Sequence, residues 1–191
     1  MRRLIDEHGP LSIEDILARQ PSEPYAALLR AIVGQQLSTR SAEAIFGRLV
    51  AKFDGRGPTP RELIEMDPEE LRSVGLSHAK VAYLRDLAER VEDGELQLDL
   101  LKQLTDEEVS SQLTAVKGVG QWTTDMFLMF NLGRPDVFPV GDLGIRNAMK
   151  RLYDLPEKPT PADYARIAEP WRPHRSLASL YLWTALRAMP V

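Results

Sequence analysis

Apolar residues recur along most of the chain with the spacing of amphipathic helices, three or four residues apart. The spacing is clearest in two segments, with Leu28, Ile32 and Gln35 on one face of the first and Val81, Leu84, Leu87, Ala88 and Val91 on one face of the second. Runs that alternate apolar and polar residues, which are typical of strands, are nearly absent. The pattern therefore predicts an all-α fold.

Capping signals mark where several of these helices begin. Thr59-Pro60-Arg61-Glu62, Asp67-Pro68-Glu69-Glu70 and Thr160-Pro161-Ala162-Asp163 combine an N-cap, a Pro at the first helical position and an acid two residues later, and Thr105-Asp106-Glu107-Glu108 lacks only the Pro. Together with the apolar spacing, they predict helices over about 12–19, 24–36, 39–53, 60–65, 68–74, 78–92, 106–113, 119–132, 142–152, 162–169 and 174–188.

Two breaks divide the predicted helices into lobes. One lies at Gly34–Ser38 and the other in the loop Gly133–Gly141, which contains two prolines. We expect one helical lobe over about 37–133 and a second built from 1–36 and 134–191, within a single module. An active-site cleft is expected between two such lobes.

Composition narrows the class of protein. The chain has 191 residues, no Cys and a net charge of −4. Without Cys there is no ligand for an iron–sulfur cluster and no disulfide, and no apolar run is long enough to span a membrane. We expect a cytoplasmic monomer. The negative charge argues mildly against nucleic acid, but basic residues cluster locally at Arg166, Arg172, His174, Arg175 and Arg187, with Lys117 elsewhere.

The most informative stretch runs from Thr114 to Asp142. It predicts a helix that ends at Gly118-Val119-Gly120, a second apolar helix, and a Pro-rich loop that ends in Asp142. Glycines allow close approach of another backbone, and the unpaired N–H groups at a helix start bind anions. Such a hairpin is a phosphate site or a plain helix–helix turn. Asp142 is in turn a natural N-cap, and a helix N-terminus stabilises an ionised carboxylate.

These residues resemble the helix-hairpin-helix DNA glycosylase superfamily, and within it the DNA-3-methyladenine glycosylase II branch. The resemblance rests on Val116-Lys117-Gly118-Val119-Gly120-Gln121-Trp122-Thr123, on Val140-Gly141-Asp142, on Gly34-Gln35-Gln36-Leu37-Ser38, on Gly75-Leu76-Ser77 with Lys80, and on Trp171-Arg172-Pro173-His174-Arg175-Ser176. It extends over most of the chain and implies a two-lobed helical fold.

The resemblance implies an enzyme that hydrolyses the N-glycosidic bond of alkylated bases such as 3-methyladenine and 7-methylguanine in double-stranded DNA, during base-excision repair. Asp142 would be catalytic. Bifunctional relatives carry a Lys nucleophile where this chain has Trp122, so we expect hydrolysis without strand cleavage. The alternatives are a non-catalytic helix-hairpin-helix DNA-binding module and a glycosylase for other damaged or mismatched bases.

The resemblance also assigns further site residues. The flipped base would meet Trp122, Trp183, Met126 and Tyr25, with Met126 standing where the family has a stacking Tyr; Tyr181 is a weaker candidate. Gln36, or Leu37 beside it, would fill the gap in the duplex. The DNA backbone would meet Lys117, Gly118, Val119, Gly120, Lys80 and Arg175. No cofactor is required, although the family commonly holds Na⁺ or K⁺ on hairpin carbonyls that match Thr114, Val116 and Val119.

Overall fold

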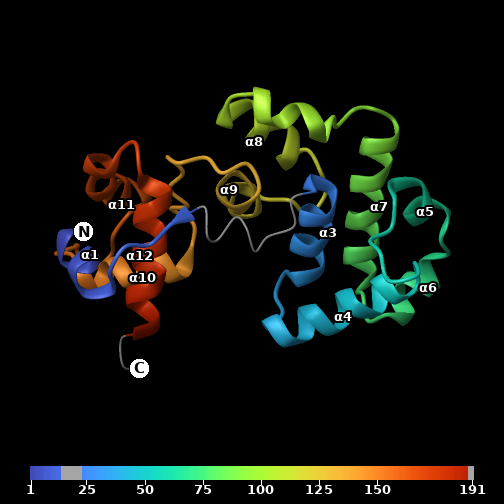
Figure 1. Ribbon diagram of the computed structural model, residues 1–191, viewed down its shortest axis with the longest axis horizontal. Coiled ribbons are helices and arrows are strands. Elements are labelled where there is room, and N and C mark those ends of the chain that lie inside the picture. Colours follow the sequence, from blue (N-terminus) through green and yellow to red (C-terminus); the bar gives the residue numbers. More distant parts are fainter. Residues whose placement is uncertain (14–22, 189–191) are drawn as a thin grey trace. The chain divides into compact units, whose positions relative to one another are not determined.

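The computed structural model describes residues 1–13 and 23–188, and the regular elements within these ranges are helical. They are α1 (Arg2–His8), α3 (Pro24–Gly34), α4 (Thr39–Ala51), α5 (Pro60–Glu65), α6 (Pro68–Ser73), α7 (His78–Glu92), α8 (Asp106–Thr114), α9 (Gln121–Phe130), α10 (Leu143–Leu152), α11 (Pro161–Ala168) and α12 (Arg175–Ala188), with the 3₁₀ segments η1 (Leu98–Gln103) and η2 (Glu169–Trp171) (Figure 1). The expected all-α fold is confirmed. None of the described helices has the length and apolar character that a bilayer crossing requires.

The capping signals begin the helices they were expected to begin. The Thr59 hydroxyl accepts the N–H of Glu62, whose carboxylate accepts the N–H of Thr59, and α8 and α11 begin with the same reciprocal pair. Each cap satisfies donors that the helix cannot satisfy itself and contributes about 1 kcal/mol. The starts of these helices are therefore determined locally.

The chain divides into two compact units, Pro21–Thr124 and the combined stretches Met1–Gln20 and Asp125–Val191. In the first unit, α7 lies between α3 and the α5–α6 pair (Figure 1). The fully buried side chains at this junction include Leu28, Ile32, Leu84 and Leu87. These are the residues that the helical spacing placed on the apolar faces of α3 and α7.

In the other unit, α12 packs against both α10 and α1. The core between these helices contains Ile145, Met149 and Leu182, all without exposed surface. Tyr181 also belongs to this core, because its hydroxyl donates to the carbonyl of Gly9 and accepts the N–H of Leu11. Tyr181 is thus a structural residue, which removes it from the candidates for the base pocket.

Two features differ from the sequence-based expectations, and a third expectation falls mostly outside the described residues. The spacing did not predict α1, a seven-residue helix of which Leu4 is the buried member. Most of the helix expected at 12–19 lies outside the described residues. The units also divide at 20/21 and 124/125 rather than near 36 and 133, because α3 packs against α4 and α7 and so joins their unit.

Candidate functional site

The hairpin between α8 and α9 is built around Gly118. Gly118 has φ 80°, in the left-handed region that favours glycine, and an added Cβ would lie 2.2 Å from the ring of Tyr83. A Cβ on Gly120, by contrast, would meet nothing within 4 Å. Gly118 therefore packs the hairpin onto α7, whereas Gly120 leaves open space beside the backbone.

The N–H groups of the hairpin are divided between internal contacts and free donors. The N–H of Val119 donates to the carbonyl of Val116 at 3.1 Å and closes the turn. Val119 was expected to meet the DNA backbone, but its N–H is therefore not available to a phosphate. Within the described residues, the N–H groups of Gly118 and Gly120 have no protein acceptor. Two unpaired backbone donors shortly before α9 suit an anion.

Asp86 of α7 anchors the hairpin, and the sequence analysis did not select it. Its carboxylate accepts the N–H of Lys117 at 2.9 Å, the Lys117 ammonium at 3.0 Å and the Arg90 Nε–H at 3.1 Å. The residue is only 7% exposed. Burial raises the pKa of Asp86, but these hydrogen bonds outweigh burial and hold the pKa below its usual value. The sequence signal that could have identified Asp86 is an acidic residue between the apolar residues Leu84 and Leu87.

Two of the three cations expected at the DNA backbone are held by protein partners. The Lys80 ammonium donates to the carbonyls of Val33 and Gln35, each at 2.7 Å. Arg175 is 18% exposed and binds both carboxylate oxygens of Asp136, at 2.7 and 2.9 Å. The structure thus gives both residues internal positions. Lys117 pairs with Asp86 but stays 69% exposed, so it can still reach phosphate.

The loop after α3 presents Gln36 and Leu37 to solvent. Gln36 has φ 57°, which is uncommon for a residue other than glycine, and its side chain is exposed. Leu37 is an exposed large apolar residue, at 38%. Gln36 is thus not a buried amide, and both residues remain candidates to enter a duplex.

Asp142 is the N-cap of α10. Its Oδ1 accepts the N–H of Ile145 at 2.8 Å and the indole Nε1–H of Trp183 at 2.9 Å. Two donors on one oxygen, at the positive end of a helix dipole, orient and stabilise the carboxylate. The capping interpretation of Asp142 is confirmed, and it is compatible with chemistry because the residue is only half-buried.

Trp183, the donor to Asp142, is held in place by its own packing. Its ring packs on Phe130, with centroids 6.0 Å apart, and lies against the backbone of Gly144, where an added Cβ would come within 3.2 Å of the indole. The indole is half-buried. The indole N–H edge of Trp183 is therefore directed at the Asp142 carboxylate. The sequence analysis expected Trp183 to meet the flipped base and did not include this hydrogen bond.

Trp122 and Met126 share one face of α9, a single turn apart. Trp122 is 46% exposed, which excludes core packing as its role, and Met126 is half-buried. Leu143, directly after Asp142, is 70% exposed.

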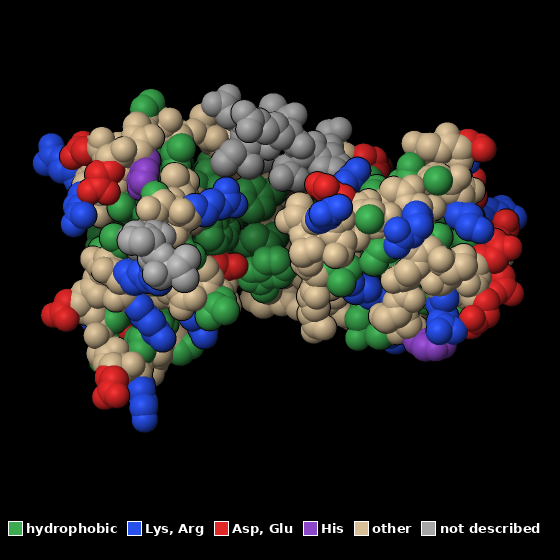
Figure 2. Space-filling view, turned by 90° about the horizontal axis from the view of Figure 1, so that it is seen from below, with side chains coloured by type: hydrophobic (Ala, Val, Ile, Leu, Met, Phe, Trp, Pro, Cys, Tyr) green, Lys and Arg blue, Asp and Glu red, His purple; other side chains and the backbone are tan. Residues whose placement is uncertain are grey.

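Charge is distributed unevenly over the unit Pro21–Thr124. Figure 2 shows Asp and Glu gathered at the end formed by α5 and α6, whose acidic residues are Glu62, Glu65, Asp67, Glu69 and Glu70. On α7, Tyr83 and Asp86 face the hairpin, whereas Arg85 donates to the carbonyls of Ile64 and Met66 on the acidic side. The acidic residues thus lie across α7 from the hairpin.

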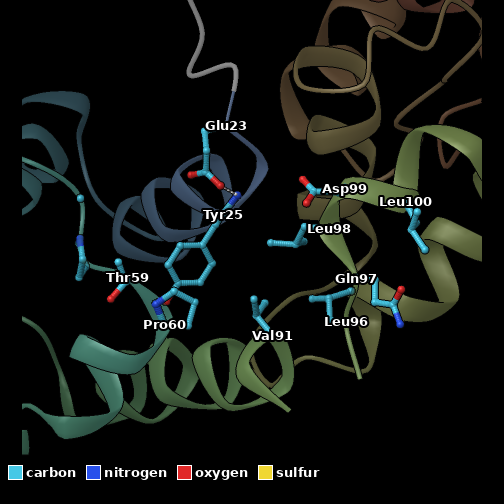
Figure 3. A pocket seen from close by; sticks show the side chains of 12 residues that line it. Glu23, Tyr25, Thr59, Pro60, Val91, Leu96, Gln97, Leu98, Asp99 and Leu100 are labelled. Atoms are coloured by element: carbon cyan, nitrogen blue, oxygen red, sulfur yellow. Dashed lines mark hydrogen bonds between the residues drawn. The ribbon is translucent and has the colours of Figure 1, made fainter. Parts of the chain in front are cut away.

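Tyr25 lies at the opposite end of α3 from Gln36 and Leu37, the candidates to enter the duplex. It is 6% exposed at the start of α3 and lines a cavity of ≈ 620 Å³, beside Pro60 and near Val91 and Leu98 (Figure 3). Its hydroxyl has no hydrogen-bond partner within the described residues, and burial raises its pKa above the usual value. Since Gln36 follows the opposite end of α3, the expectation for Tyr25 is not supported.

The alkali-metal site on the carbonyls of Thr114, Val116 and Val119 stays a prediction. The Val116 carbonyl already accepts the N–H of Val119, which closes the turn. Its oxygen retains a second lone pair that could bind a cation. Among the described residues, no three His, Asp or Glu side chains come together in a way that would hold a metal ion.

Comparison with known proteins gives the family. A model of the HhH-GPD superfamily base excision DNA repair proteins matches residues 29–173. DNA-3-methyladenine glycosylase 1 of Schizosaccharomyces pombe is 39% identical over 166 residues, covering 86% of this chain and 73% of that protein. A putative DNA-3-methyladenine glycosylase of Bacillus subtilis is 32% identical, covering 97% of this chain and 69% of that protein. The chain belongs to the HhH-GPD superfamily.

Solved structures agree with this placement. A 3-methyladenine DNA glycosylase of S. pombe in complex with abasic DNA superposes with a TM-score of 0.82 at 36% identity, covering 97% of this chain and 90% of that one. A DNA-3-methyladenine glycosidase of Bacillus halodurans gives a TM-score of 0.80 at 34% identity, covering 97% and 88%. The fold expected from the resemblance is therefore confirmed.

Proposed function

We propose that this chain is a monofunctional DNA glycosylase that hydrolyses the N-glycosidic bond of alkylated bases, of the 3-methyladenine and 7-methylguanine type, in double-stranded DNA. Asp142 is the observation that carries the proposal. It is a half-buried carboxylate that two donors orient at a helix N-terminus, in a chain of a base-excision repair family. The enzyme would act in the cytoplasm on nucleoid DNA, as a monomer.

The reaction needs a fixed negative charge more than it needs an acid. A base alkylated at N3 or N7 is cationic, and it leaves neutral when it takes the electron pair of the bond to C1′. The sugar is left with the positive charge, which the Asp142 carboxylate stabilises. Water then bonds to C1′ and gives up a proton, so the products are free base and an abasic site.

Trp122 accounts for both the substrate and the outcome. Its exposed indole offers an electron-rich face to a flipped cationic base. It cannot attack C1′ as a Lys at that position would, so no Schiff base forms and the strand stays intact.

DNA binding would rest on the hairpin rather than on net charge. The donors of Gly118 and Gly120 suit a phosphate, and Lys117 adds an exposed cation beside them. The acidic side chains of α5 and α6 lie across α7, away from this site. A chain with a net charge of −4 thereby keeps a DNA-binding surface.

The test is release of a base. Duplexes carrying 7-methylguanine or 3-methyladenine are incubated with the protein, and free base and alkali-labile sites are measured. We expect both products, and we expect Asp142→Asn to slow release roughly 10³-fold while still binding DNA. Asp154→Asn removes an exposed Asp after α10 and serves as the matched control.

Other results would point to the alternatives. Binding without release from any alkylated duplex would indicate a non-catalytic DNA-binding module. Release only from oxidised or mismatched duplexes would indicate another glycosylase of the superfamily. Strand breaks without alkali would contradict the monofunctional assignment and the weight placed on Trp122.

A further inference from the structure

The loop that carries Gln36 adopts a backbone conformation that needs support. Gln36 has φ 57°, and this left-handed region is unfavourable for a residue with a Cβ. Helix α3 ends at Gly34, and Gln35 follows as its C-cap in a non-helical conformation. We refer to residues 35–37 as the wedge loop. The N–H of Leu37 donates to the carbonyl of Gly34 at 3.2 Å and closes the turn, and contacts with other elements add to this bond.

Lys80 supplies the first of these contacts. From the first turn of α7, its ammonium donates to the carbonyls of Val33 and Gln35, at 2.7 Å each. These carbonyls belong to the end of α3, where helical partners are lacking. The backbone of Gln35 is thereby fixed against α7.

The side chain of Gln35 supplies the second contact, to the hairpin. Its Nε2 donates to the carbonyl of Gly118 at 2.8 Å and lies 3.5 Å from the hydroxyl of Thr123. Only the amide nitrogen fits here, because the amide oxygen would face another acceptor. Gly118 is itself fixed by Tyr83, and Thr123 is 5% exposed. The wedge loop is thus bonded to a rigid part of the hairpin.

We propose that Gln35 is a positioning residue that sets how the wedge loop enters the duplex when the hairpin holds the DNA backbone. This inference rests on the proposed function. In the structure, Gln35, which precedes Gln36, is hydrogen-bonded to Gly118, whose N–H would face phosphate. A grip on the backbone then fixes the wedge loop at the base pair being opened.

The test compares base opening with binding. Gln35→Leu keeps the size of the side chain and removes the donor. With 2-aminopurine beside an alkylated base, we expect about 10-fold weaker opening and equally slower single-turnover release, as for one lost hydrogen bond. Affinity for a duplex with an abasic site, where no base is opened, should change less than about 3-fold. Gln97→Leu, whose amide meets only the Gly94 carbonyl at 3.4 Å on the surface, is the control.

A double-mutant cycle separates positioning from general support. Gln35→Leu is combined with Gln36→Ala and, separately, with Leu37→Ala. If Gln35 acts through the wedge loop, its effect on opening is largely lost in at least one background. Full additivity in both would overturn the proposal, as would an equal loss of opening and abasic-site binding. Gln35→Glu should weaken opening more than Gln35→Leu, because it sets an anion against the Gly118 carbonyl.

The readouts also separate this proposal from the proposed function. If wild type opens the duplex but releases no base, the glycosylase assignment fails while the opening cycle still tests Gln35. Thermal unfolding of each variant shows whether it folds. Should Gln35→Leu not fold, Lys80→Met with Lys52→Met as control tests the other support of the loop. Unchanged opening by Lys80→Met would then contradict the mechanism.

Discussion

The starts of α9 and α10 present opposite solutions to the same problem of unpaired N–H groups. At α10, the chain brings its own anion, since Asp142 accepts from Ile145 and Trp183. Before α9, the N–H groups of Gly118 and Gly120 have no acceptor among the described residues, and open space lies beside Gly120. Under the proposed function, the first arrangement would fix a charge for the reaction, and the second would leave room for a DNA phosphate. The start of α10 is thus capped by a carboxylate of the chain, whereas the start of α9 is preceded by two glycine N–H groups that have no acceptor among the described residues.

The largest expected effect concerns the two glycines before α9. Gly118→Ala should destabilise the fold by about 3 kcal/mol, because it combines a left-handed φ with a Cβ inside the Tyr83 ring. In a chain of this length, that lowers Tm by roughly 6–12 °C. Gly120→Ala, with open space around its Cβ, should stay within about 0.5 kcal/mol in stability and weaken DNA binding instead. Equal losses of stability would mean that the two glycines are not specialised.

A smaller effect is expected beneath the hairpin, at Asp86. Asp86→Asn should cost about 2 kcal/mol at neutral pH, because charge-assisted bonds from Lys117 and Arg90 are weakened. Since the folded pKa lies below the usual value, the ionised carboxylate contributes stability above its unfolded pKa of about 3.9. That contribution is lost as pH falls through the folded pKa.

Unfolding by urea at several pH values measures this difference. The gap between wild type and Asp86→Asn should be constant from about pH 5 to 8 and should narrow below about pH 4. Asp93→Asn, at the exposed C-cap of α7, serves as control and should show no such gap. A gap that widens in acid would contradict the assigned cause.

The capped start of α10 is tested by Trp183→Phe, which keeps an aromatic ring but removes the donor to Asp142. We expect about 10-fold slower base release, equivalent to one hydrogen bond to a charged group, with little change in DNA affinity. Trp171→Phe alters an aromatic cluster of the same unit that does not touch Asp142 and should release base at the normal rate. If affinity falls but the rate does not, Trp183 acts on the base and not on the carboxylate.

Local sequence signals predicted much of this molecule. Capping boxes such as Thr59–Glu62 act within one turn, so the sequence contains the whole interaction. Gly118 and Asp142 were likewise identified from their immediate neighbours. The all-α class followed from the apolar spacing, and the family motif added the functional interpretation.

Long-range partners could not be read in this way. Gln35 and Gly118 are 83 residues apart, and Arg175 and Asp136 are 39 apart. Nothing near Lys80 shows that its ammonium meets the end of α3, and nothing near Tyr25 shows that α3 directs it away from the wedge loop. These pairings depend on how helices pack, which residue type and local spacing do not encode.

The smallest expected effect concerns two cations that were expected at the DNA backbone, Lys117 and Arg175. Arg175→Gln should leave the salt dependence of DNA binding unchanged, because Asp136 already occupies its guanidinium. Lys117→Gln should reduce the slope of log affinity against log salt by about 1, since that side chain is 69% exposed and an exposed ion pair exchanges readily for phosphate. Titrations between low and physiological salt distinguish the two. A reduced slope for Arg175→Gln would mean that DNA displaces Asp136, and that an internal ion pair belongs to the binding surface after all.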